Sequence, residues 1–205
     1  MSWSVRVWDT LNDALLVEAE NGVRVVDGEA VVVIRGFDPP IVTPPGSSRV
    51  LNLFARRDLF DVPPRAIVQF SVSDTPVFWG PAVVVPPITS PGAGPFDQDR
   101  DALERITVVG GEQLLRDSGV NDLLIEGDLD VATIAFQFCS LYAHPALTVA
   151  EVNFPECGAV LNAFYKPESS LYDALQTLVD SVPGGATAWV DASGVVHFEA
   201  LEVGS

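Results

Sequence analysis

Residues 164–201 constrain the fold more tightly than any other segment, because their local signals agree on one compact unit. From Leu171 to Val182, apolar residues recur at spacings of three and four with polar residues between them, which predicts an amphipathic helix. Ser170 can cap the first turn of this helix through its hydroxyl. Pro183 cannot continue the hydrogen-bond ladder and two glycines follow it, so we expect the helix to end near Val182.

A β-hairpin is predicted directly after this helix. Residues 186–191 and 195–201 are short strand-forming runs, and favourable turn residues fill the positions between them from Asp191 to Gly194. The helix and the hairpin together predict a small α/β module.

The first half of the chain is rich in short predicted strands separated by turn residues. These strands are expected at 3–8, 14–20, 23–27, 30–35, 49–56, 65–73, 77–85 and 103–109. Their spacing is typical of an antiparallel barrel or sandwich. A short helix is predicted at 111–117 and a longer one at 131–143, capped by Asp130. The predicted fold class is therefore α+β, with a β-barrel domain at 1–110 and a smaller mixed α/β module at 111–205 that holds two or three helices and a hairpin.

Two proline-rich segments, 37–48 and 86–101, interrupt the strands and cannot pair regularly in a sheet. Long loops in compact domains are often contact surfaces, so both segments are candidate assembly elements. The longer helix is apolar over most of its circumference, which predicts that it is buried or lies at an interface. The candidate assembly-interface residues are Pro44, Pro45, Pro91, Phe96, Asp97, Asp99, Phe136 and Phe138.

The composition indicates a folded protein, because 48% of the 205 residues are hydrophobic and can bury a core. No window approaches the roughly 20 apolar residues that span a bilayer, and the N-terminus lacks the pattern of a secretory signal, so no membrane location is expected. Cys139 and Cys157 are interpreted as buried free thiols made in a reducing compartment, with a disulfide as the alternative.

The net charge of −17 comes from 28 acidic and 11 basic residues. Such a surface repels nucleic acid rather than binding it. Two interpretations remain open, namely solubility alone or a functional acidic surface.

No motif indicates catalysis: the sequence contains no nucleophile elbow, no phosphate-binding glycine loop and no zincin helix. His144 and His197 each lack a partner at metal-binding spacing, and no activating context for a cysteine–histidine dyad is visible. Asp97, Asp99 and Asp101 are spaced like the start of a calcium loop, but the turn glycine and the closing glutamate are missing. We therefore expect no enzyme activity, no cofactor and no metal.

Four short motifs follow one another along the chain. They are Val77-Phe-Trp-Gly-Pro, Ile106-Thr-Val-Val-Gly-Gly-Glu-Gln-Leu-Leu, Ser169-Ser-Leu-Tyr-Asp-Ala-Leu-Gln-Thr-Leu-Val and Ala188-Trp-Val-Asp-Ala-Ser-Gly-Val-Val-His-Phe. This order resembles the baseplate hub or tail-tip hub proteins of long-tailed bacteriophages and related injection machines.

The resemblance implies a structural role in a virion tail. In that family a tube-like β-barrel continues the tail tube and an α/β module braces it, and the assembled ring surrounds a DNA channel. The implied partners are other copies in a ring and other tail proteins, namely the tail tube, the distal tail protein, a second hub chain, and the central fibre or tape measure. DNA is expected to pass without specific binding, because an acidic lumen repels a polyanion. The chain is expected to be made in the host cytoplasm.

One departure and three alternatives accompany this resemblance. Larger hubs carry a second barrel after the hairpin, whereas this chain stops at Ser205. A separate chain may be expected to supply that barrel, although another ring stoichiometry or a fragment would also explain the difference. The alternatives are a distal tail adaptor, which is all-β in its second part, a carbohydrate- or receptor-binding tail module, and a tail-associated peptidoglycan hydrolase.

Overall fold

The computed structural model describes residues 2–9, 14–38, 50–56, 62–63, 65–84 and 103–201. These residues fall into two compact units, with those up to Gly110 in unit 1 and those from Gly111 in unit 2.

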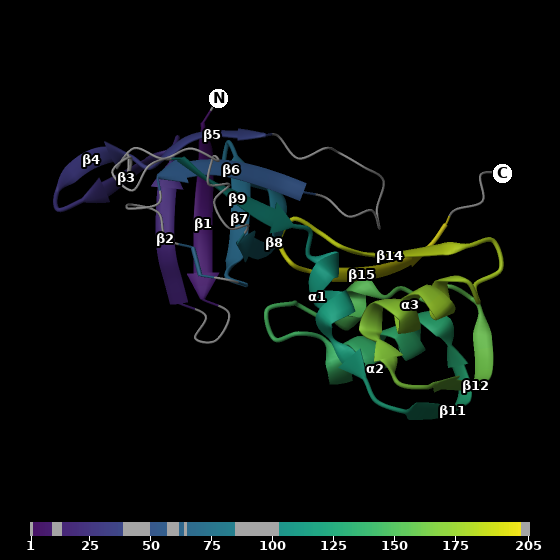
Figure 1. The fold of residues 1–205 in the computed structure, drawn as a ribbon. Coiled ribbons are helices and arrows are strands. Elements are labelled where there is room, and N and C mark those ends of the chain that lie inside the picture. Colours follow the sequence, from purple (N-terminus) through teal and green to yellow (C-terminus); the bar gives the residue numbers. More distant parts are fainter. Residues whose placement is uncertain are drawn as a thin grey trace. The chain divides into compact units, whose positions relative to one another are not determined.

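Unit 1 is a nearly closed antiparallel β-barrel of nine described strands (Figure 1). The strands are β1 (Trp3–Asp9), β2 (Ala14–Glu20), β3 (Val23–Val26), β4 (Glu29–Val32), β5 (Ile34–Asp38), β6 (Val50–Arg56), β7 (Ile67–Val72), β8 (Thr75–Val84) and β9 (Leu103–Val109). Their order in the sheet is β4-β3-β2-β1-β7-β8-β9-β6-β5. The antiparallel barrel predicted from the strand spacing is thus confirmed.

Val33 joins the two edge strands β4 and β5, where the sequence predicts one strand over 30–35. Its N–H donates to the Gly22 carbonyl oxygen and its own carbonyl accepts from the Arg56 N–H, both at 2.8 Å. Val33 therefore ties the β2–β3 turn to the end of β6 and helps to close the barrel. Gly22 has a φ of +78°, and a Cβ there would lie 2.2 Å from the Ile34 carbonyl oxygen, so the turn requires glycine.

Aromatic side chains fill part of the barrel interior. The ring of Phe37 on β5 lies 5.2 Å from that of Trp3 on β1 and 4.6 Å from that of Phe70 on β7. Because β5 is distant from β1 and β7 in the strand order, these contacts cross the interior of the barrel rather than running along the sheet. Burying such rings is a large contribution to the stability of the core.

Unit 2 is a mixed α/β module with three described α-helices (Figure 1). Its elements are α1 (Glu112–Asp117), β10 (Gly119–Val120), β11 (Leu123–Asp130), α2 (Val131–Tyr142), the 3-10 helix η1 (Glu151–Asn153), β12 (Val160–Lys166), β13 (Ser169–Ser170), α3 (Leu171–Val179), β14 (Ala186–Val190) and β15 (Val196–Ala200). Three antiparallel pairs form, β10 with β13, β11 with β12, and β14 with β15. The α+β class, a barrel followed by a smaller mixed module, is confirmed.

Asp130 begins α2, as predicted, and also holds a second segment. Its Oδ1 accepts from the Ala132 N–H at 2.9 Å, the bond that caps the helix. The same carboxylate accepts from the N–H groups of Cys157 at 3.2 Å and Gly158 at 2.9 Å. One side chain therefore fixes both the helix start and the chain just before β12.

Ser170 caps α3, as predicted, through a 3.1 Å bond from the Asp173 N–H to its hydroxyl. The helix ends at Val179, three residues earlier than predicted. The N–H groups of Ser181 and Val182 donate to carbonyls three residues before them, at 3.0 and 3.3 Å, so the chain tightens beyond the helix. Val182 is still buried, which explains why it matches the apolar pattern of the helix.

Candidate functional site

Six of the candidate assembly residues lie outside the described residues, namely Pro44, Pro45, Pro91, Phe96, Asp97 and Asp99. Phe138 is fully buried, and its ring meets that of Phe164 edge-on at 5.5 Å, so this side chain packs the interior of unit 2. Phe136 is partly buried, with its ring 5.6 Å from that of Phe154. The two phenylalanines thus have different packing partners, and an assembly role for these residues stays a prediction.

The two cysteines are free thiols in different surroundings, so the alternative of a disulfide is wrong. Cys139 is buried as predicted, and burial raises the pKa of its thiol to about 12. It therefore stays protonated and unreactive at neutral pH. Cys157 is only partly buried, and its Sγ lies 3.3 Å from Asp130 Oδ1, to which it can donate.

His197 is part of a small polar cluster on the β14–β15 hairpin. Its ring stacks on that of Trp189 at 4.9 Å, and its Nε2 lies 3.1 Å from Asp191 Oδ2. The other carboxylate oxygen of Asp191 accepts from the N–H groups of Ser193 at 2.7 Å and Val195 at 3.0 Å. This arrangement accounts for the predicted turn, since one aspartate both closes it and orients the histidine.

Within the described ranges, no group of three or more histidine, cysteine, aspartate or glutamate side chains is placed to hold a metal ion. The acidic run at 97–101 lies outside those ranges. None of the helices described is both long enough and apolar enough to span a bilayer.

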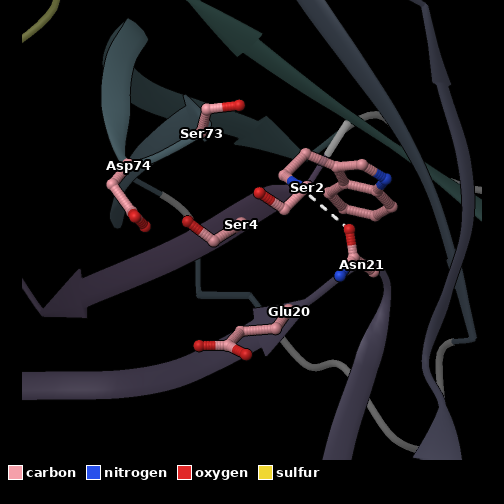
Figure 2. Close-up of a pocket in the computed structure, with 7 residues that line it drawn as sticks. Ser2, Ser4, Glu20, Asn21, Ser73 and Asp74 are labelled. Carbon is pink, nitrogen blue, oxygen red and sulfur yellow. Dashed lines mark hydrogen bonds between the residues drawn. The ribbon is translucent and has the colours of Figure 1, made fainter.

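A polar pocket of about 280 Å³ lies beside the start of β1 (Figure 2). It is lined by Ser2, Trp3, Ser4, Glu20, Asn21, Ser73 and Asp74. Asn21 Oδ1 accepts from the Trp3 N–H at 3.0 Å, the dashed line in Figure 2, which ties the β2–β3 turn to β1. The lining can hydrogen-bond a polar ligand, but it holds no histidine, cysteine or lysine that could serve as base or nucleophile.

The charge of the chain is distributed unequally between its two halves. Residues 1–110 contain 14 acidic and nine basic residues, a net −5, whereas residues 111–205 contain 14 acidic and two basic residues, a net −12. Both cations of the second half are engaged within unit 2. The Arg116 guanidinium lies 3.6 Å from the centre of the Tyr172 ring, and Lys166 Nζ donates to Thr177 Oγ1 at 2.8 Å. The surface of unit 2 is therefore predominantly acidic.

Comparison with known proteins finds similarity in structure only. No family model matches the chain, and no curated protein matches its sequence. The crystal structure of the prophage MuSo2 43 kDa tail protein from Shewanella oneidensis superposes with a TM-score of 0.58 at 11% identity, over 97% of this chain and 54% of that one. A tail protein from Neisseria meningitidis MC58 gives a TM-score of 0.48 at 14% identity, over 96% of this chain and 50% of that one.

The chain spans about half the length of both tail proteins. At 11% identity, the similarity to the Shewanella protein establishes a shared fold and not a shared activity. This fold agrees with the resemblance to phage tail proteins drawn from the four sequence motifs.

Proposed function

We propose that this protein is a structural component of a phage tail. The observation that carries the proposal is the combined architecture, a nearly closed barrel followed by an α/β module, which superposes over 97% of the chain on a prophage tail protein. Because a common fold can host different functions, the proposal also rests on the absence of any recognisable catalytic motif from the sequence.

Within the tail, we propose a place at the tip or baseplate hub. There the barrel would continue the tail tube, and copies of the chain would form a ring around the DNA channel. The net charge of −17 supports this place, since an acidic wall repels the phosphate backbone and lets DNA pass without binding. The proposed partners are the tail tube, the distal tail protein, a second hub chain, and the central fibre or tape measure.

A scaffold role needs neither a catalytic centre nor a cofactor, and we propose that the protein is not an enzyme. The best-formed candidate chemistry in the described residues supports this. The Cys139 thiol is buried with its pKa raised to about 12, and the Cys157 thiol contacts a carboxylate, which does not favour a thiolate.

The distal tail adaptor is a weaker alternative. It requires an all-β second part, whereas unit 2 contains α1, α2 and α3. A carbohydrate- or receptor-binding module has no specific support, since the polar pocket of Figure 2 has one aromatic residue in its lining.

Negative-stain electron microscopy and mass photometry of the purified protein test the proposed ring, both alone and after co-expression with neighbouring tail genes. Closed rings of threefold or sixfold symmetry are the expected result. A monomer that persists with every tail partner would contradict the proposal.

A further inference from the structure

The outer face of the β11–β12 ribbon carries two large apolar side chains that nothing in unit 2 covers. Leu124 and Tyr165 are direct cross-strand partners, and they are 52% and 57% exposed. The next pair along the ribbon, Ile125 with Phe164, points to the opposite face and is buried, at 9% and 7% exposed. The ribbon therefore has an inner face that packs the core and an outer face that is apolar at its centre.

The inner face explains why this ribbon is held firmly in place. Phe164 contacts Phe138 of α2, and Lys166 reaches from the end of β12 to α3, where its Nζ donates to the Asp173 carbonyl at 3.2 Å and to Thr177 Oγ1 at 2.8 Å. The outer pair consequently sits on a fixed support. A preorganised surface of this kind loses little conformational entropy when a partner binds.

Acidic residues surround the outer pair. Glu126 follows Leu124 on the same face of β11 and is exposed, and Asp128 in the bulge beyond it is exposed as well. At the other end, Asp122 accepts from the backbone N–H of Glu168 at 2.9 Å, which places two further carboxylate side chains there. Lys166, the cation of the ribbon, is directed to α3 instead. The outer face is thus an apolar centre within an acidic rim.

The ribbon also leaves backbone groups free for pairing. In the part of the chain that the structure describes, β11 and β12 form a two-stranded sheet with no third strand. The bulge between Glu126 and Leu129 limits regular pairing on one side to residues 123–126 opposite 163–166. An exposed edge of this kind can accept an extended segment through main-chain hydrogen bonds, with alternate side chains giving specificity.

We infer that the outer face of the β11–β12 ribbon binds an extended segment of another protein, in which apolar side chains alternate with arginine or lysine. The apolar side chains pack on Leu124 and Tyr165, and the cations face the acidic rim. A second copy of this chain fits poorly, because two chains of net charge −17 repel each other. The patch is also far smaller than the roughly 800 Å² per partner of a stable interface, so it suits a short segment bound weakly. This inference rests on the ribbon alone and does not depend on the proposed tail function.

The test uses the full chain and a synthetic six-residue peptide of alternating arginine and valine, with binding measured by fluorescence polarisation. A peptide of alternating arginine and serine has the same charge and tests the apolar centre. The double variant Leu124→Ser, Tyr165→Ser keeps every charge of the protein. The matched control, Leu141→Ser with Val152→Ser, removes two other exposed apolar side chains from unit 2, which are 65% and 84% exposed.

We expect the Leu124→Ser, Tyr165→Ser variant and the arginine–serine peptide each to weaken binding by about tenfold or more, and the matched control to leave it unchanged. Equal binding by both variants would mean diffuse electrostatic attraction and would overturn the inference. In ¹⁵N-labelled wild-type protein, chemical-shift changes on adding the peptide should concentrate in residues 123–126 and 163–166. Changes spread over all acidic segments would contradict it, as would a self-association in analytical ultracentrifugation that only the double variant abolishes.

Discussion

Asp130 stabilises unit 2 through more contacts than an ordinary helix cap, and its replacement offers a quantitative test of the structure. Asp130→Ala removes the acceptor for the Ala132 N–H at the start of α2. It also removes the acceptor for the N–H groups of Cys157 and Gly158. Ser170→Ala on α3 is the matched control, because Ser170 caps its helix through a single backbone N–H, that of Asp173.

The expected losses follow from these counts. Removing a helix cap costs about 1 kcal/mol. The two extra N–H bonds go to a charged acceptor, but one of them is solvent-exposed, so together they add roughly 1 to 2 kcal/mol. We therefore expect Asp130→Ala to lower the unfolding free energy of unit 2 by about 2 to 3 kcal/mol, and Ser170→Ala to lower it by about 1 kcal/mol.

Urea denaturation followed at the Trp189 indole resonance measures this difference, because the other three tryptophans lie in residues 1–110. With a urea slope of about 1 kcal/mol per molar, the midpoint should fall by roughly 2 to 3 M for Asp130→Ala and about 1 M for Ser170→Ala. Equal midpoints for the two variants would refute the idea that Asp130 joins two segments.

Three further predictions concern the two units separately. Gly22→Ala should destabilise unit 1 by at least about 2 kcal/mol more than Gly28→Ala in thermal unfolding, since both have positive φ but only Gly22 has a carbonyl oxygen 2.2 Å from the new Cβ; equal losses would contradict the closure of the barrel at this turn. At pH 8, iodoacetamide should modify Cys157 well before Cys139, whose pKa of about 12 keeps it protonated, and intact mass spectrometry would expose the opposite order. Phe138→Ala should cost about 3 to 5 kcal/mol in urea denaturation, and a loss under 1 kcal/mol would mean that the side chain is not in the core.

Local signals in the sequence predict much of this fold. The hydroxyl of Ser170 and the carboxylate of Asp130 mark helix starts because capping depends on residues a few positions apart. The glycine and aspartate of the 191–194 turn act over an equally short range. Such elements were predicted within a few residues of their observed bounds.

Features that depend on distant residues were missed. The β11–β12 ribbon pairs residues about 40 positions apart, and its outer pair of Leu124 and Tyr165 breaks the usual rule that apolar side chains alternate inward. The division of one predicted strand at Val33 depends on hydrogen bonds to Gly22 and Arg56, which are distant from it in the sequence. No local pattern reports these contacts, although the exposed alternation of Leu124, Ile125 and Glu126 could have indicated a strand.

The most direct test of a structural role in the tail is to locate the protein in an intact particle. Gold-labelled antibodies against the chain, viewed by electron microscopy on purified phage particles that carry its gene, distinguish the possible positions. A structural component of the tail tip predicts gold at the distal end of the tail on most particles, with no label after the tip is removed. Particles that lack the label at the tail altogether would contradict the account.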